Sequence, residues 1–98
     1  MSDHPFEVEF TGLAREQYLS AMRRAKSVAR SAELATAMRR LIVQLSETPL
    51  EIGEPMYRLR AMKMDVRRVA LAPTYLEYGV HFTEPLVIVR RVFGMVEP

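Results

Sequence analysis

The order of hydrophobic and polar residues changes period along this 98-residue chain. Residues 6–10 read Phe-Glu-Val-Glu-Phe, a strict apolar and acidic alternation that predicts a strand with one buried and one solvated face. Apolar residues then recur every three or four positions in two stretches. These stretches predict two amphipathic helices, the first capped by Thr11 and the second by Ser31. The second helical pattern ends at Thr48 and Pro49, because the residue before a proline is pushed out of the helical region.

Short β-rich runs occupy the rest of the chain. Four such runs are separated by two or three residues each, at residues 56–62, 65–72, 75–82 and 86–93. Strands joined this tightly pair as antiparallel neighbours, since a parallel crossover needs a dozen or more residues. The N-terminal strand has a much longer connection, so it is expected to pair with an inner strand in either direction.

The order of strand, two helices and four strands predicts a single α+β domain of two layers, spanning residues 1–98. The helices form a hairpin that covers one face of a mainly antiparallel meander sheet. Alternation in the first β-rich run directs Tyr57 and Leu59 toward the helices. Arg58 and Arg60 then point to the opposite face, which is therefore expected to carry the arginines.

Composition excludes several classes of protein. The chain has no cysteine, which rules out a disulfide scaffold and a thiolate zinc site. No apolar run approaches the roughly 20 residues that span a membrane, and the first residues lack the features of a signal peptide, so a cytoplasmic location is expected. The glycines form no phosphate-binding loop, and His4 and His81 show no metal-ligand spacing. No cofactor and no metal are expected.

Basic residues are concentrated in two regions, although the formal net charge is only +2. Residues 11–46 hold seven basic and two acidic residues, and residues 56–96 hold seven basic and three acidic ones. Twelve of the fourteen basic residues are arginine, whose planar guanidinium suits phosphate and carboxylate groups. This distribution fits a polyanion or an acidic protein as partner, and it equally fits a solvated basic surface.

Several short motifs carry a resemblance to a known family. They are, in order, Leu45-x-x-x-Pro49, Gly53-Glu-Pro-Met-Tyr-Arg-Leu59, Val66-Arg-Arg68, Tyr78-Gly-Val80 and Val87-Ile-Val-Arg-Arg-Val92. Together with the order of elements, they resemble the RelE/ParE superfamily of bacterial toxins from type II toxin–antitoxin systems, from Phe6 to Val92. The resemblance implies a small cytoplasmic toxin that an acidic antitoxin protein holds inactive. One branch of the family cleaves messenger RNA on the ribosome, and another inhibits DNA gyrase.

The resemblance also implies where a ribonuclease site would lie. Such an enzyme activates the ribose 2′-hydroxyl, stabilises charge on phosphorus and protonates the leaving 5′-oxygen. The candidate catalytic residues are Lys63, Arg67, Arg68, Tyr75 and His81. The candidate nucleic-acid-binding residues are Arg58, Arg60, Arg90 and Arg91. Because adjacent strand residues point oppositely, only one of Arg67 and Arg68 shares a face with Arg58, and a regular strand favours Arg68.

Two features depart from the pattern of ribonucleolytic members. Tyr75 stands near the place of the family's catalytic arginine, and residues 93–98, Phe-Gly-Met-Val-Glu-Pro, supply no arginine, histidine or tyrosine after the last strand. Tyr75 and His81 each fit either proton transfer or a structural role. Three functions remain open: ribosome-dependent cleavage of messenger RNA, inhibition of a protein target such as gyrase, and a non-toxic binding module with the same fold, for example a homodimer.

Overall fold

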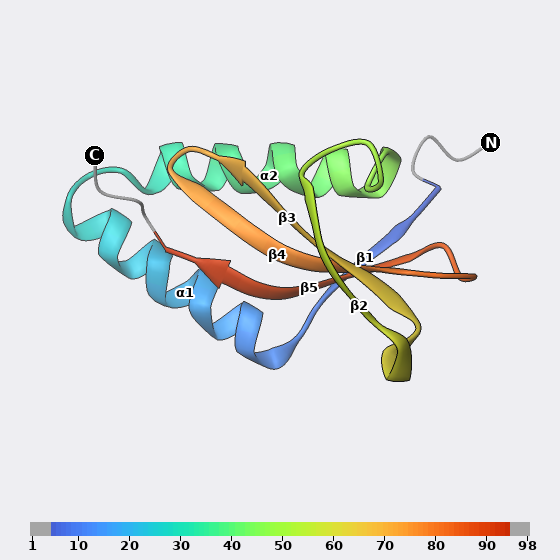
Figure 1. The fold of residues 1–98 in the computed structure, drawn as a ribbon. Coiled ribbons are helices and arrows are strands. Elements are labelled where there is room, and N and C mark those ends of the chain that lie inside the picture. Colours follow the sequence, from blue (N-terminus) through green and yellow to red (C-terminus); the bar gives the residue numbers. More distant parts are fainter. Residues whose placement is uncertain (1–4, 95–98) are drawn as a thin grey trace.

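The computed structural model describes residues 5–94, which form one five-stranded sheet and two helices (Figure 1). The elements are β1 (Glu7–Phe10), α1 (Gly12–Ser27), α2 (Ser31–Glu47), β2 (Glu54–Leu59), the 3-10 turn η1 (Arg60–Met62), β3 (Met64–Leu71), β4 (Thr74–His81) and β5 (Leu86–Phe93). The predicted α+β architecture is confirmed. His4 and residues 95–98, which entered the predictions above, lie outside the described residues. Within residues 5–94 no helix is long and apolar enough to cross a membrane.

The strands lie in the order β1-β5-β4-β3-β2. β2 to β5 form the predicted antiparallel meander. β1 pairs with β5 in the parallel direction, from the match of Glu7 with Leu86 to that of Phe10 with Val89. The first and last strands of the chain are therefore neighbours, and β1 and β2 form the two edges of the sheet.

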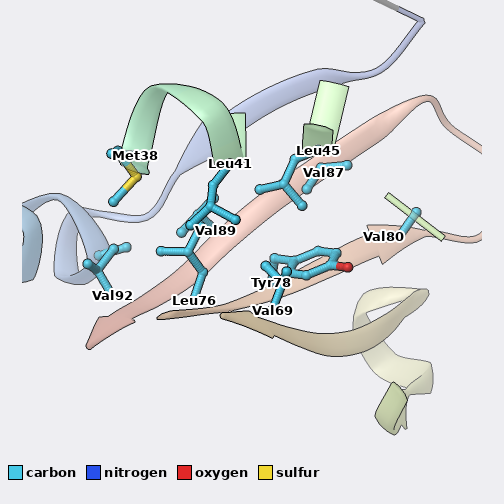
Figure 2. Close-up of a cluster of buried hydrophobic side chains, with 11 residues drawn as sticks. Met38, Leu41, Leu45, Val69, Leu76, Tyr78, Val80, Val87, Val89 and Val92 are labelled. Atoms are coloured by element: carbon cyan, nitrogen blue, oxygen red, sulfur yellow. The ribbon is translucent and has the colours of Figure 1, made fainter. Parts of the chain in front are cut away.

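The main core lies between α2 and the sheet (Figure 2). Met38, Leu41 and Leu45 of α2 are spaced three and four residues apart, so they share one helix face. They pack on a cluster of buried sheet residues: Val69, Leu76, Tyr78, Val80, Val87, Val89 and Val92. The alternation of Leu76, Tyr78 and Val80 fixes which face of β4 the helices cover.

α1 extends the cover over β5 beyond the end of β1. Thr11 caps the helix as predicted, because its Oγ1 accepts a hydrogen bond of 3.0 Å from the Ala14 amide. The Thr11 amide donates to the Val89 carbonyl at 3.0 Å, and Gln17 Oε1 accepts from the Val92 amide at 2.8 Å. The Thr11 contact continues the pairing of β1 with β5, and the Gln17 contact satisfies a backbone group of β5 beyond the end of β1.

Ser31 does not cap the second helix, in contrast to the prediction. Arg30 occupies the capping position without a side-chain cap, and Ser31 is the first residue of the helix. The Arg30 guanidinium instead donates two hydrogen bonds of 2.9 Å to the Glu33 carboxylate. The positive end of the helix dipole is thus met by an acidic side chain in the first turn.

The predicted orientation of β2 is wrong. Tyr57 pairs with Val66, which in turn pairs with Gly79, whereas Tyr78 and Val80 point toward the helices. Since directly paired residues share a face, Tyr57 points away from the helices. An irregularity in register between Pro55 and Tyr57 accompanies this reversal. The run also ends early, because residues 60–62 form η1 rather than continuing the strand.

Candidate functional site

Charged and aromatic side chains gather on the sheet face that points away from the helices, which we call the open face. Glu77 on β4 pairs with Arg68 of β3 on one side and with Arg91 of β5 on the other. Tyr75 pairs with Phe93 one step further along the same face. Register and contacts together place these residues on the open face: Tyr57, Arg68, Tyr75, Glu77, Arg90, Arg91 and Phe93.

Glu77 is the centre of this group and is only 6% exposed. The Tyr57 hydroxyl donates to Oε1 at 3.2 Å, and Arg91 Nε lies 3.4 Å from Oε2. Arg90 Nη1 in turn donates to the Tyr57 hydroxyl at 3.2 Å. A buried carboxylate is tolerated only with such partners. Glu77 therefore fixes the positions of Tyr57 and Arg91.

The arginines of the open face outnumber its central carboxylate. The side chain of Arg91 remains 58% exposed while it contacts Glu77. Arg68 is exposed and, within residues 5–94, its guanidinium makes no hydrogen bond or ion pair. The site therefore has spare cationic donors that point into solvent, which is the arrangement that binds phosphate or carboxylate oxygens.

Apolar side chains fill the part of the open face next to this group. Met64 and Val66 of β3 are 2% and 1% exposed. Met64 lies directly over Gly79, and a Cβ at that position would collide with its sulfur atom. This apolar patch separates the Glu77 group from the turn that connects β2 to β3.

Three of the predicted cations lie at that far end of the sheet. Arg58 pairs with Asp65, to which its Nε donates at 3.0 Å, and its guanidinium lies over the Phe82 ring. Arg60 belongs to η1, and Lys63 follows it with a positive φ of 54°. These cations do not share the centre of the open face with Arg68, so the predicted common surface of Arg58, Arg60 and Arg68 is wrong.

His81 has a structural contact that limits its chemistry. Its Nδ1 accepts hydrogen bonds from the Thr83 amide at 3.2 Å and from the Glu84 amide at 3.0 Å. The imidazole therefore stabilises the turn between β4 and β5. Only Nε2 remains for another partner. His81 also lies four residues along β4 from Glu77.

Arg67 stabilises the loop that leads into β2. It pairs with Tyr78 on the helix-covered side of the sheet, and its Nη2 donates to the Ile52 carbonyl at 3.0 Å. The Tyr78 hydroxyl lies 2.8 Å from the Pro49 carbonyl and 3.0 Å from the Ile52 carbonyl. Burial raises the pKa of Tyr78, and the hydrogen bond from Arg67 opposes that rise. We call this set the Tyr78 latch.

The predicted residues thus fall into separate places. Arg68, Tyr75, Arg90 and Arg91 meet on the open face, whereas Arg67 belongs to the Tyr78 latch. Tyr57 and Glu77 were missed by the sequence analysis. The available signal was a carboxylate between the apolar residues Leu76 and Tyr78 in a central strand, where a charge needs partners.

Comparison with known proteins agrees with this architecture. No family model matches the sequence, and neither does any curated protein. The fold is that of the RelE/ParE-like toxins, as the sequence motifs predicted. The structure of the toxin–antitoxin complex RelBE2 from Mycobacterium tuberculosis contains a similar chain, with a TM-score of 0.66 and 22% identity over 98% of this chain and 98% of that one. A chain of the chromosomal ParDE toxin–antitoxin system from P. aeruginosa has a TM-score of 0.64 and 11% identity, over 96% of this chain and 99% of that one.

Proposed function

We propose that this protein is the toxin component of a type II toxin–antitoxin system and that it acts on RNA through the open face. The observation that carries the proposal is the group of Arg68, Arg90 and Arg91 around the Tyr57 and Glu77 pair on the sheet face that points away from the helices. Guanidinium groups bind phosphate oxygens, and tyrosine rings stack on unpaired bases. The two similar solved structures are both described as toxin–antitoxin systems, which supports the toxin role.

The same group offers chemistry for cleavage of a phosphodiester bond. Arg68 and Arg91 are placed to stabilise the negative charge that develops on the phosphate oxygens. When the 2′-oxygen attacks phosphorus, its proton passes to water and the bond from phosphorus to the 5′-oxygen breaks. The Tyr57 hydroxyl lies between a carboxylate and a guanidinium, so it is placed to pass its proton to the leaving 5′-oxygen, and solvent then returns a proton to Tyr57. We propose these roles in place of His81 and of the residues that the family carries after its last strand.

The partner that we propose is an acidic antitoxin in the bacterial cytoplasm. Carboxylates of such a protein would satisfy the exposed guanidinium groups and block access of RNA to the open face. A second candidate function is inhibition of a protein target without cleavage. It is favoured because His81 is engaged in a turn, and cleavage would then depend on Tyr57 as the main candidate proton donor.

A cell-free translation reaction distinguishes these functions. The purified protein is added to bacterial extract, and both protein synthesis and the length of the message are followed. We expect synthesis to stop and the message to be cut at codon boundaries. Intact message with unimpaired synthesis would contradict action on RNA and leave the protein-target function.

The Glu77→Gln substitution is expected to separate binding from activity. It keeps an acceptor for Tyr57 but removes the negative charge at the centre of the open face. Affinity for single-stranded RNA should rise a few-fold, because one opposing charge is lost. Growth arrest should fall at least tenfold, because Arg91 loses its ion-pair partner and is no longer held beside Tyr57, which is roughly 1.4 kcal/mol of transition-state stabilisation. Parallel filter-binding and growth assays measure both, and a fall in both would contradict this role of Glu77.

A further inference from the structure

A slot beside the Glu77 group has the shape and charges of a base-binding site. It is an open hollow of about 530 Å³, lined by Gly53, Glu54, Arg68, Val69, Ala70 and Tyr75. Ala70 pairs directly with Tyr75 across β3 and β4, so a small side chain faces a large ring and leaves a hollow between them. Gly53 and Glu54, where β2 begins, form one side of the slot.

The aromatic wall of the slot is held in place from behind. The Tyr75 ring stacks on Phe93, with ring centroids 4.2 Å apart and an angle of 10° between the planes. Phe93 comes from β5, on the side of β4 opposite to Ala70. A flat ligand above Ala70 would therefore meet the other face of Tyr75 and continue the stack, an arrangement common in the recognition of unpaired bases.

One side of the slot depends on a glycine. Gly53 has a φ of 72°, and a Cβ there would lie 2.5 Å from the Arg68 carbonyl oxygen. The backbone of β3 and the loop before β2 approach each other closely at this point. Any other residue at position 53 would push the loop away and change the slot.

Opposite charges stand on the rim of the slot. Glu54 and Arg68 are paired across β2 and β3, and both are exposed. Within residues 5–94 neither side chain makes an ion pair or a hydrogen bond. A carboxylate accepts two adjacent N–H groups, and a guanidinium donates to two adjacent acceptors. Guanine offers N1–H and N2–H on one edge and O6 and N7 on the next.

From these features the geometry points to a guanine-binding slot, in which Tyr75 stacks on the base, Glu54 accepts from N1 and N2, and Arg68 donates to O6 and N7. This inference rests on the proposed action on RNA and deepens it by naming the base that is read. Arg68 then serves two purposes, since it lies between the slot and the Glu77 group. The slot would place a guanosine next to the phosphate that the arginines bind.

Fluorescence anisotropy with labelled nine-residue RNAs tests the slot. The RNAs are oligouridine strands with a central guanosine, inosine, adenosine or uridine. We expect the guanosine strand to bind about tenfold more tightly than the adenosine and uridine strands, with inosine between them because it lacks the N2 amino group. Equal affinities for the four strands would overturn the slot and leave RNA binding intact. No binding of any strand would overturn both proposals.

Two variants connect that preference to the slot. Ala70→Leu fills the hollow without changing a charge, and it should abolish the preference for guanosine while binding of oligouridine persists. Glu54→Gln should reduce the ratio of guanosine to adenosine affinity about tenfold. Ala61→Leu in η1, where the alanine is also exposed, is the matched control and should keep the full preference. Preserved preference in folded Ala70→Leu protein, checked by thermal unfolding, would overturn the assignment.

The same titration separates two sources of guanine. Guanosine monophosphate is added as a competitor of the labelled guanosine strand. Competition at the concentration of the strand's own dissociation constant would indicate that the slot takes free nucleotide. Competition only at a concentration at least a hundredfold higher would indicate that it reads a base within RNA, with the flanking phosphates bound by Arg90 and Arg91.

Discussion

Replacement of Arg68, Arg90 and Arg91 together by alanine is expected to abolish growth arrest and to weaken the binding of single-stranded RNA at least a hundredfold. Each charge-assisted hydrogen bond to phosphate contributes about 1.5–3 kcal/mol. The dependence of affinity on salt provides a second test. The slope of log K against log salt should fall by about two, since three phosphate contacts contribute roughly 0.7 each.

A charge-matched control distinguishes the open face from overall charge. Arg23, Lys26 and Arg40 are exposed cations on the two helices, and their joint replacement by alanine removes the same charge. This control should bind RNA within about threefold of the wild type, because charges far from a binding site act weakly at physiological salt. Equal losses in the two triple variants would show that RNA is bound by diffuse charge. Circular dichroism confirms folding of both proteins.

Removal of Tyr78 is expected to have the largest effect on stability. The side chain is fully buried in the main core, and Figure 2 shows its ring among the residues of the sheet and α2 with the hydroxyl at the edge of the cluster. Tyr78→Ala should lower the free energy of unfolding by about 3–5 kcal/mol. Tyr78→Phe keeps the ring and removes only the hydroxyl of the latch, so it should cost about 1–3 kcal/mol. Urea unfolding measures both.

The pH dependence of stability provides a check on the latch. Burial raises the pKa of Tyr78 in the folded protein above its ordinary value of about 10. The folded state therefore favours the neutral phenol, and this contribution is fully present below pH 10 and is lost as the pH rises through the folded pKa. The wild type should therefore lose stability more steeply than Tyr78→Phe as the pH rises above about 10. Parallel curves for the two proteins would contradict the latch.

Much of the fold is predictable from the sequence because the local signals agree. The alternation in residues 6–10, the Thr11 cap and the helix stop before Pro49 each act over a few residues, and all are found in the structure. The meander follows because its connections are too short for any other pairing. The strand that pairs with β1 could not be predicted from local signals. The parallel match of Phe10 with Val89 joins the two ends of the chain and depends on the packing of all the elements between them.

The candidate site was only partly predictable, because a small change in register exchanges the two faces of a strand. The irregularity before Tyr57 is such a change, and it moves Tyr57 from the predicted core to the open face. Arg67 was a candidate because the family resemblance places basic residues of the catalytic sheet there, and His81 because imidazole is a common acid–base group. In the structure, Arg67 contacts Tyr78, and His81 accepts from the Glu84 amide. No pattern in the local sequence encodes these contacts.

The most direct test of the central claim is to map the RNA contact surface by nuclear magnetic resonance. Amide resonances of the labelled protein are followed during titration with a short RNA strand. We expect the largest shifts on the open face, at Arg68, Tyr75, Glu77 and Arg91, with little change along the outer surface of α1. Shifts confined to the helices, with the resonances of β3 to β5 unchanged, would contradict the claim that the open face is the working surface of this protein.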